Sequence, residues 1–211
     1  MTIVIHGDGI KVESKFEYEF WKQSGYRYKK GILCYIKRKM SHTLNFIYYG
    51  RMQEKVNNKY LKKWYGLWKR KIGNKYGMEI TSFEKIGRGL LLCHAYNITV
   101  NENAVLGNDV TLFKGSTIGS IRTGKRKGVP CIGDRVVVGI NATVVGGVSI
   151  GNDVMIAPGA YVNFDVPSNS VVIGNPGCIY SKMNAADDYY TAFADKKRLD
   201  EEIEKCLKKR N

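Results

Sequence analysis

Large aliphatic residues recur every six positions through much of this 211-residue chain, and that spacing constrains the fold more than any other feature. The members are Ile80, Ile86, Leu92, Ile98, Val100, Leu106, Leu112, Ile118, Ile132, Val138, Val144, Ile150, Ile156 and Val162. An α-helix needs apolar residues about 3.6 positions apart, and a half-buried strand needs every second one. A period of six predicts short parallel strands wound into a prism, with three hexapeptides in each turn of about 18 residues. Stacked turns bury an apolar column that no single turn could bury.

The repeat is interrupted at two places. Two extra residues reset the series at Val100, and thirteen residues separate Ile118 from Ile132 where five would continue the pattern. We interpret residues 119–131 as a loop that projects from the prism. It carries the cations Arg122, Lys125, Arg126 and Lys127. Loops on a rigid scaffold commonly carry function. The repeat domain is expected to span residues 78–180.

The segments that flank the repeats are predicted to be helical. Residues 1–77 form a basic, mostly helical segment, in which apolar residues are spaced three and four positions apart. The apolar anchors are Phe16, Phe20, Trp21, Ile32, Tyr35, Ile36, Leu61, Trp64, Leu67 and Trp68, and breaks are expected near Gly25, Gly31, Gly50 and Gly77. Residues 181–211 are expected to hold a C-terminal helix over 187–209.

Positive charge is concentrated at one end of the sequence. The formal net charge is +15, and residues 1–78 hold 18 Lys/Arg against 5 Asp/Glu. Such a segment attracts polyanions, namely nucleic acid, an anionic membrane or an acidic substrate, although solvated helix faces show the same pattern. Because no groove-reading motif accompanies the charge, we expect no specific nucleic-acid partner. Peripheral contact with an anionic membrane stays open.

Cysteine and histidine usage limits the chemistry and the compartment. The five cysteines form no CxxC pair and the chain has three histidines, so we expect no metal site. Free thiols are typical of a reducing cytosol. Neither a secretory signal nor an apolar run of membrane-spanning length is recognisable. We therefore expect a cytoplasmic protein, with any membrane association on the cytoplasmic face.

The segment from Glu79 to about Tyr180 resembles the serine acetyltransferase branch of the hexapeptide-repeat acyltransferases. The most specific part is the stretch GRGLLLCHAYNITV, and the segment ends in DVPSNSVVIGNPGCIY, which is similar to the exit from that family's last coils. About half the chain is covered. The resemblance implies a mainly β fold, a left-handed parallel β-helix, and transfer of an acetyl group from acetyl-CoA to a hydroxyl.

The resemblance implies a catalytic pair formed by His94 and Glu79. The family's histidine is the general base that takes the proton from the acceptor hydroxyl as its oxygen attacks the thioester. Imidazole suits this task because its pKa near 6.5 leaves it neutral at working pH. Glu79 lies fifteen residues earlier, where the family usually has an Asp that orients the histidine. Without the resemblance, a structural histidine and a surface carboxylate would be the simpler interpretation.

Further contacts are implied around the thioester and the cofactor. A backbone N–H near Gly119 or Ser120 falls where the family steadies the thioester oxygen, and Ser120 replaces a glycine. CoA in this superfamily lies in the groove between neighbouring subunits of a homotrimer. Ile140 and Pro158 match positions whose backbone grips it.

The contacts to the CoA phosphates are less well defined. Two cationic positions of related sugar acetyltransferases fall on Phe164 and Cys178, which carry no positive charge. Lys182 is therefore the first candidate for these contacts, and Arg126 and Lys127 of the loop are the others.

Three departures from the family bear on the acceptor. The Asp before the catalytic histidine is Cys93 here, and an Arg-His pair that serves serine binding is Gly128-Val129. A free amino acid carries two charges, and a site for it needs charged partners. The sequence therefore argues against serine as the acceptor. The pattern instead resembles the subgroup that acetylates sugar hydroxyls in surface-polysaccharide synthesis, which implies a sugar or surface-polysaccharide precursor as the acceptor, with Cys93 and Val129 at its site. The basic, aromatic-rich N-terminal segment fits that interpretation.

Other function classes remain open from the sequence. Within the same chemistry, the acceptor is alternatively serine or another small metabolite. Outside it, the chain is a catalytically silent β-helix scaffold or a protein that binds polyanions or membranes through its basic segment. The Glu79 and His94 pair argues against the scaffold.

Overall fold

The computed structural model describes residues 15–24 and 32–187. Four helices come first: α1 (Lys15–Ser24), α2 (Ile32–Met40), α3 (His42–Lys55) and α4 (Lys59–Tyr76). The strands that follow are β1 (Glu79–Ile80), β2 (Leu91–Cys93), β3 (Thr99–Val100), β4 (Val105–Leu106), β5 (Thr111–Phe113), β6 (Thr117–Gly119), β7 (Cys131–Ile132), β8 (Val137–Val138), β9 (Thr143–Val145), β10 (Ser149–Ile150), β11 (Val154–Ile156), β12 (Tyr161–Val162), β13 (Ser170–Ile173) and β14 (Cys178–Ser181). The C-terminal helix predicted for 187–209 lies outside the described residues apart from its first position.

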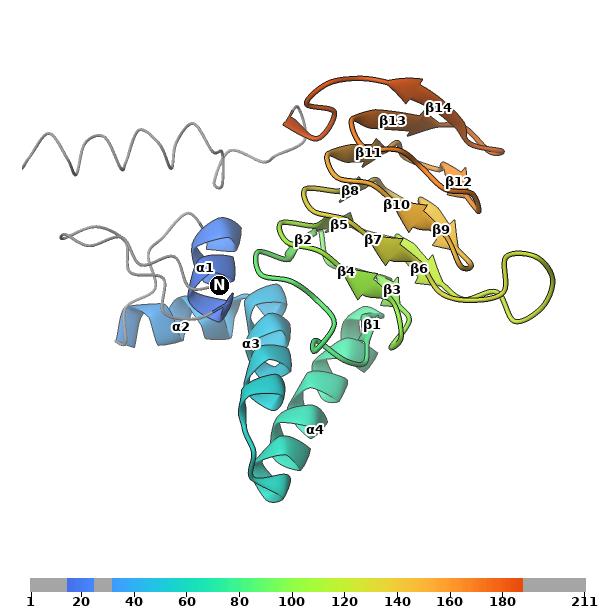
Figure 1. The fold of residues 1–211 in the computed structure, drawn as a ribbon. Coiled ribbons are helices and arrows are strands. Elements are labelled where there is room, and N and C mark those ends of the chain that lie inside the picture. Colours follow the sequence, from blue (N-terminus) through green and yellow to red (C-terminus); the bar gives the residue numbers. More distant parts are fainter. Residues whose placement is uncertain (1–14, 25–31, 188–211) are drawn as a thin grey trace, which may run out of the picture.

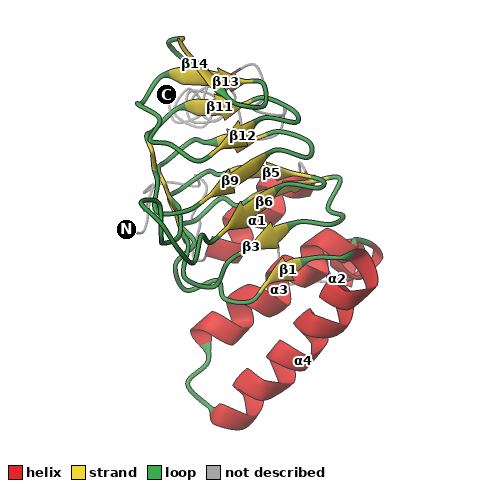
Figure 2. Cartoon of the chain, turned by 90° about the vertical axis from the view of Figure 1, so that its right-hand side faces the viewer, coloured by secondary structure: helices red, strands yellow, loops and turns green. Residues whose placement is uncertain are grey.

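The strands stack into the three faces of a left-handed parallel β-helix, as the period of six predicts (Figure 1). One sheet runs β1-β3-β6-β9-β12, a second β10-β7-β4, and a third β14-β13-β11-β8-β5-β2. Within residues 15–24 and 32–187, strands pair in parallel with their counterparts in the next coil, except that β13 and β14 pair antiparallel. Figure 2 shows the first of these sheets face-on, with α3 and α4 below its β1 end.

The aliphatic series forms the core of the β-helix. Every member is at most 4% exposed, and Leu92, Leu112, Val138 and Ile156 are fully buried in one column. The residue four places after a repeat position is small where the chain turns, as at Ser116, Ala142 and Ala160. The prediction that these residues point into the prism is confirmed.

The two residues that interrupt the six-residue spacing ahead of Val100 lie at a corner of the first coil. They come earlier in the chain than the spacing suggests. Cys93 pairs with Phe113 twenty residues later, whereas Thr99 pairs with Thr117 eighteen residues later. The insertion therefore falls between Cys93 and Thr99. Val100 stacks below Ile118, so Ile98 takes the place that Ser116 holds one coil later. The six-residue spacing from Leu92 to Ile98 is a coincidence that the insertion produces.

The helices gather at the β1 end of the β-helix, where α3 and α4 form an antiparallel pair (Figure 1). Ser41 caps the start of α3, and Asn58 caps α4 by accepting from the N–H groups of Tyr60 and Leu61. Gly77 ends α4 in the left-handed conformation at φ 69°, which confirms the predicted break there. The break predicted at Gly50 is wrong.

Gly50 lies inside α3 because the packing requires the absence of a side chain there. A Cβ on Gly50 would come within 2.4 Å of the Phe83 ring. Residues 32–76 also expose more apolar surface than the helical pattern predicted. Phe16 and Phe20 of α1 are buried, but the following apolar residues of α2 and α4 are more than a third exposed: Ile32, Tyr35, Ile36, Leu61, Trp64, Leu67 and Trp68.

Buried ionic contacts fasten α1 and α3 to the first coil. Arg51 of α3 bonds the carboxylate of Glu19 in α1, at 2.5 Å from its Nη2 to Oε1. The same guanidinium donates to the carbonyls of Phe83 and Ile86 at 3.2 and 3.0 Å. Lys22 of α1 donates to the Gly89 carbonyl at 2.8 Å. The helical segment is thus anchored to the base of the β-helix.

Candidate active site

His94 occupies the widened corner between β2 and β3. It and Ala95 are the two residues that the first coil has in excess, because Cys93 aligns with Phe113 and Tyr96 aligns with the next residue, Lys114. The His94 backbone takes the left-handed conformation at φ 51°, which is uncommon outside glycine. The side chain is exposed. The insertion therefore lifts an imidazole out of the regular prism surface.

Three aromatic rings lie beside this corner. His42, at the start of α3, stacks on Tyr76 with ring centroids 4.1 Å apart, and Tyr96 lies 5.2 Å from His42. Nε2 of His42 is 3.3 Å from the carbonyl oxygen of Ala95. The helical segment thus contributes one wall to the surroundings of His94, which the sequence alone did not indicate.

Glu79 begins β1, in the sheet next to the corner. Its N–H donates to the Ile98 carbonyl at 2.8 Å, and it pairs with Thr99. Its side chain is exposed, like that of His94. Within residues 15–24 and 32–187, neither side chain makes a hydrogen bond or ion pair. The orientation of His94 by Glu79 therefore stays a prediction.

A single column of corner residues rises from the His94 coil. Tyr96, Lys114, Ile140 and Pro158 each precede a residue in the left-handed conformation: Asn97, Gly115, Asn141 and Gly159. The backbone links these corners, since Asn141 N–H donates to the Lys114 carbonyl at 3.1 Å and Gly159 N–H donates to the Ile140 carbonyl at 2.8 Å. The two predicted CoA positions, Ile140 and Pro158, therefore share one edge of the prism with the His94 corner.

Lys114 is the residue of this column that the sequence reasoning missed. It is exposed and lies one coil beyond the His94 corner, between that corner and Ile140. Adjacent coils lie about 4.8 Å apart. The signal that could have revealed it is the pairing of Leu92 with Leu112, because aligning those two repeats brings Lys114 next to the His94 motif.

The loop 119–131 folds back on itself. Ile121 and Gly128 form an antiparallel bridge with hydrogen bonds of 3.0 and 2.9 Å. Gly119 ends β6 and accepts from Gly146 N–H at 3.2 Å, and Ser120 follows it with an exposed side chain. Figure 1 shows the loop projecting away from the strands.

The cations nominated for CoA phosphates lie in different places. Arg126 pairs with Asp165 at 2.9 Å. The pKa of Asp165 is lowered by the N–H of Ser149 and then by Arg126. Lys127 is exposed in the loop, and Lys182 follows β14 at the far end of the β-helix from β1 (Figure 1). The structure does not bring these three cations together on the column of Lys114.

The residues predicted to contact the acceptor are uncharged. Cys93 is half-buried, and burial raises the pKa of its thiol to about 11 although Lys22 opposes that shift. A thiol with that pKa is neutral at physiological pH. Val129 is half-buried at the base of the loop, next to Gly128. Among the described residues there is no group of acidic, cysteine and histidine side chains that could hold a metal ion, and no helix long and apolar enough to cross a membrane.

Comparison with known proteins identifies the repeat. The family model described as "Bacterial transferase hexapeptide (six repeats)" matches residues 132–163. The β-helix is therefore similar to bacterial transferases built from hexapeptide repeats.

Its relatives are serine acetyltransferases. The serine acetyltransferase of Helicobacter pylori is 43% identical over 101 residues, which are 47% of this chain and 58% of that protein. The structure of the Neisseria gonorrhoeae enzyme in complex with serine matches with a TM-score of 0.62 and 27% identity, over 77% of this chain and 66% of that one. A serine acetyltransferase in complex with CoA matches with a TM-score of 0.56 and 25% identity, over 66% of this chain and 57% of that one. The matched segment thus spans less than two thirds of each relative's length.

Proposed function

We propose that the chain is an acetyl-CoA-dependent O-acetyltransferase of the serine acetyltransferase type, with His94 as its general base. The observation that carries this proposal is the position of His94. It lies on an inserted corner beside the one column that holds Ile140 and Pro158, within a fold whose relatives are serine acetyltransferases.

In the proposed reaction, His94 accepts one proton and later donates it. His94 takes the proton of the acceptor hydroxyl as the oxygen attacks the acetyl carbonyl. It then returns the proton to the departing thiolate, which leaves as CoA. Glu79 accepts a hydrogen bond from the imidazole and stabilises the imidazolium that forms between the two transfers. Backbone N–H groups near Gly119 and Ser120 meet the charge on the carbonyl oxygen.

L-Serine is the first candidate acceptor, in place of the sugar that the sequence predicted. The relatives that support this choice are serine acetyltransferases, one of them in complex with serine. Serine carries a hydroxyl group from which the proposed base could take the proton.

A sugar hydroxyl is the second candidate, and a specific observation favours it. Cys93 and Val129 offer no charge to the ammonium and carboxylate of an amino acid, and the Cys93 thiol is held neutral. Beside the His94 corner, Tyr96 is 47% exposed and offers an aromatic ring of the kind that stacks on sugar rings.

The test is release of free CoA from acetyl-CoA, measured with a thiol-reactive dye against L-serine, neutral sugars and nucleotide sugars at equal concentration. Turnover with serine at least tenfold above every sugar supports the first candidate, and the reverse supports the second. If no hydroxyl compound accelerates CoA release over water, the proposed activity is wrong.

The proposal includes a homotrimer with the active sites between subunits, as the resemblance implies. The exposure of both Glu79 and His94 in the single chain is compatible with a neighbour completing the site. We also propose that the protein is cytoplasmic and that α4 contacts anionic membranes. This helix holds seven Lys/Arg and no acidic residue, and it exposes Trp64 and Trp68.

Flotation with vesicles tests the membrane contact. Vesicles that contain about 30% anionic lipid should carry the protein upward at low salt, and neutral vesicles should not. Trp64→Ser should weaken the flotation because it removes an aromatic anchor. Equal flotation of the variant and the parent, or none at low salt, would remove this part of the proposal.

A further inference from the structure

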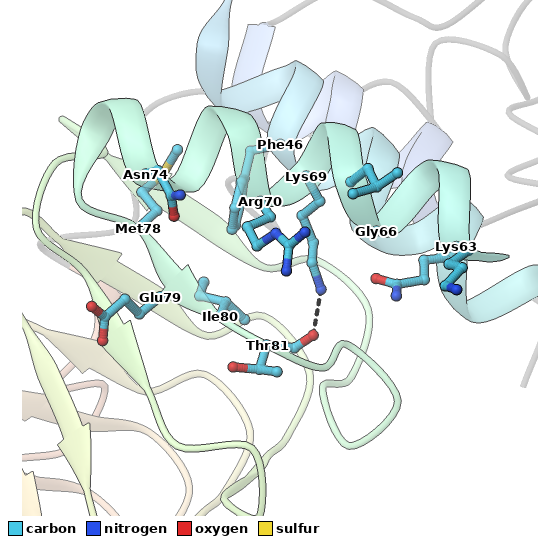
Figure 3. A pocket seen from close by; sticks show the side chains of 12 residues that line it. Phe46, Lys63, Gly66, Lys69, Arg70, Asn74, Met78, Glu79, Ile80 and Thr81 are labelled. Carbon is cyan, nitrogen blue, oxygen red and sulfur yellow. Dashed lines mark hydrogen bonds between the residues drawn. The ribbon is translucent and has the colours of Figure 1, made fainter.

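A cavity lies between α4 and the start of the β-helix, and Glu79 of the proposed pair is among its lining residues. Its volume is about 500 Å³, within the range of small-molecule sites. Figure 3 shows α4 forming one wall and residues Met78 to Thr81 forming the other. Buried apolar side chains line it from both sides: Phe46, Met78 and Ile80 are at most 4% exposed.

Three cations of α4 line the cavity: Lys63, Lys69 and Arg70. Lys69 is buried and donates to the Thr81 carbonyl, the contact dashed in Figure 3. Lys63 and Arg70 are exposed, and neither makes a hydrogen bond or ion pair with any residue that the structure describes. Arg70 follows Lys63 by seven positions, so the two side chains leave the same face of the helix. The cavity wall therefore presents two uncommitted positive charges.

Compensating negative charge is scarce around these cations. Helix α4 contains no acidic residue, and Glu79 is the one carboxylate among the cavity's lining residues. Glu84, on the connection that follows β1, is engaged by Lys62 at 3.2 Å. An anion that enters the cavity would meet Arg70 and Lys63 on one side and hydrogen-bonding groups of Asn74 and Thr81 nearby.

We propose that this cavity binds a small organic anion, with its phosphate or carboxylate group at Arg70 and Lys63 and its body over the apolar floor. Guanidinium suits this role because its planar fork bonds two oxygens of such a group at once. Phe46, Met78 and Ile80 form an apolar floor. Burial of an organic body on this floor should therefore increase the affinity over that of the inorganic anion alone.

Glu79 connects the cavity to the proposed reaction. Figure 3 shows Glu79 at the opposite end of the cavity from Lys63. Because like charges repel, its carboxylate and an anion in the cavity disfavour one another. Occupancy of the cavity therefore acts on one member of the proposed pair. This coupling rests on the proposed function, whereas the binding site itself does not.

Isothermal titration calorimetry of the full chain at about 0.15 M salt tests the site. The probes are inorganic phosphate, glucose 6-phosphate and citrate, with glucose as the neutral control. We expect at least one organic anion to bind more tightly than phosphate, and glucose not to bind. Arg70→Ala should weaken that binding about tenfold, as expected for one lost charge-assisted contact. Glu79→Gln should strengthen it several-fold.

Lys71→Ala is the matched control, because Lys71 is the next residue of α4, carries the same charge and does not line the cavity. It should change the dissociation constant less than twofold. An equal loss in both variants would mean that general positive charge, and not the cavity, attracts the probe. Absence of binding by all three anions would also overturn the proposal. If the parent protein binds an anion but transfers no acetyl group to any acceptor, the binding site is retained and the proposed function is rejected.

Discussion

At the scale of single residues, His94 is the side chain on which the proposed chemistry depends. General base catalysis contributes about 10² to 10⁴ in rate, so His94→Ala should lower kcat by that factor with the favoured acceptor. The KM for acetyl-CoA should stay within about threefold, because the imidazole is not assigned a binding contact. Steady-state CoA release measures both constants. A variant that keeps more than a third of the parental kcat would show that another group is the base.

Lys114 gives a second prediction at this scale. Its position one coil beyond the His94 corner, on the column that leads to Ile140, lies on the expected path of CoA. An exposed ion pair contributes up to about 1 kcal/mol, which corresponds to about fivefold in affinity. Lys114→Ala should therefore raise the KM for acetyl-CoA up to fivefold with little change in kcat. Lys85→Ala, which removes an exposed lysine bonded to Asn103, serves as the control. Identical KM values in the parent and Lys114→Ala would contradict the prediction.

The sequence predicts residues that belong to a continuous motif and misses those that come together across coils. His94, Glu79 and Cys93 could be nominated because they lie in one continuous stretch that resembles the family's catalytic histidine motif. Lys114 required the alignment of two coils whose lengths differ by two residues. That difference could not be placed from spacing alone, since Ile98 and Val100 are both buried aliphatic residues and either could continue the series.

At the scale of elements, the docking of α1 and α3 on the first coil depends on a buried ion pair. Removing one partner of such a pair leaves an uncompensated buried charge, at a cost of about 3–5 kcal/mol. Arg51→Met should therefore lower the free energy of unfolding by about that amount at pH 7, measured by urea denaturation. Lys62→Ala removes an exposed pair with Glu84 and should cost less than about 1 kcal/mol. Equal effects of the two substitutions would rule out the anchoring role of Arg51.

This anchoring explains why the helical part was predicted less well than the β-helix. The hexapeptide pattern reports burial directly, because each buried aliphatic residue repeats at a fixed spacing. In the helices, Glu19, Lys22 and Arg51 are buried while Leu61, Trp64 and other large apolar side chains are exposed, the reverse of the usual preference. Gly50 resembled a helix break but lies within α3, where Phe83 leaves no room for a side chain. Such contacts depend on partners more than thirty residues away.

At the scale of the whole molecule, Lys69 links stability to pH. Burial lowers its pKa from the ordinary 10.5 to about 8. Between these values the unfolded chain binds a proton that the folded chain does not, so the free energy of unfolding should rise as the pH increases from 8 to 10.5. The gain has an upper limit of about 3 kcal/mol, at 1.36 kcal/mol for each pH unit.

Lys69→Met isolates this contribution. The variant has no ammonium to titrate, so the difference in unfolding free energy between parent and variant should shift in favour of the parent over that pH range. Urea denaturation at pH 7.5, 9 and 10.5 measures the difference, and other titrating groups cancel in it. A difference that is constant across the three pH values would show that Lys69 titrates alike in the folded and unfolded chains.

Assembly is the property of the whole molecule that the proposed active site requires. Glu79 and three residues of the corner column (Tyr96, Lys114 and Pro158) are exposed on the single chain, so substrate bound to one chain alone would stay open to water. A neighbouring subunit would close that surface, which favours transfer to the acceptor over hydrolysis. Light scattering should therefore give about three times the 23.8 kDa of the chain at micromolar concentration. Dilution that dissociates this species should lower the specific activity in parallel. A monomer with undiminished turnover would show that one chain holds a complete site.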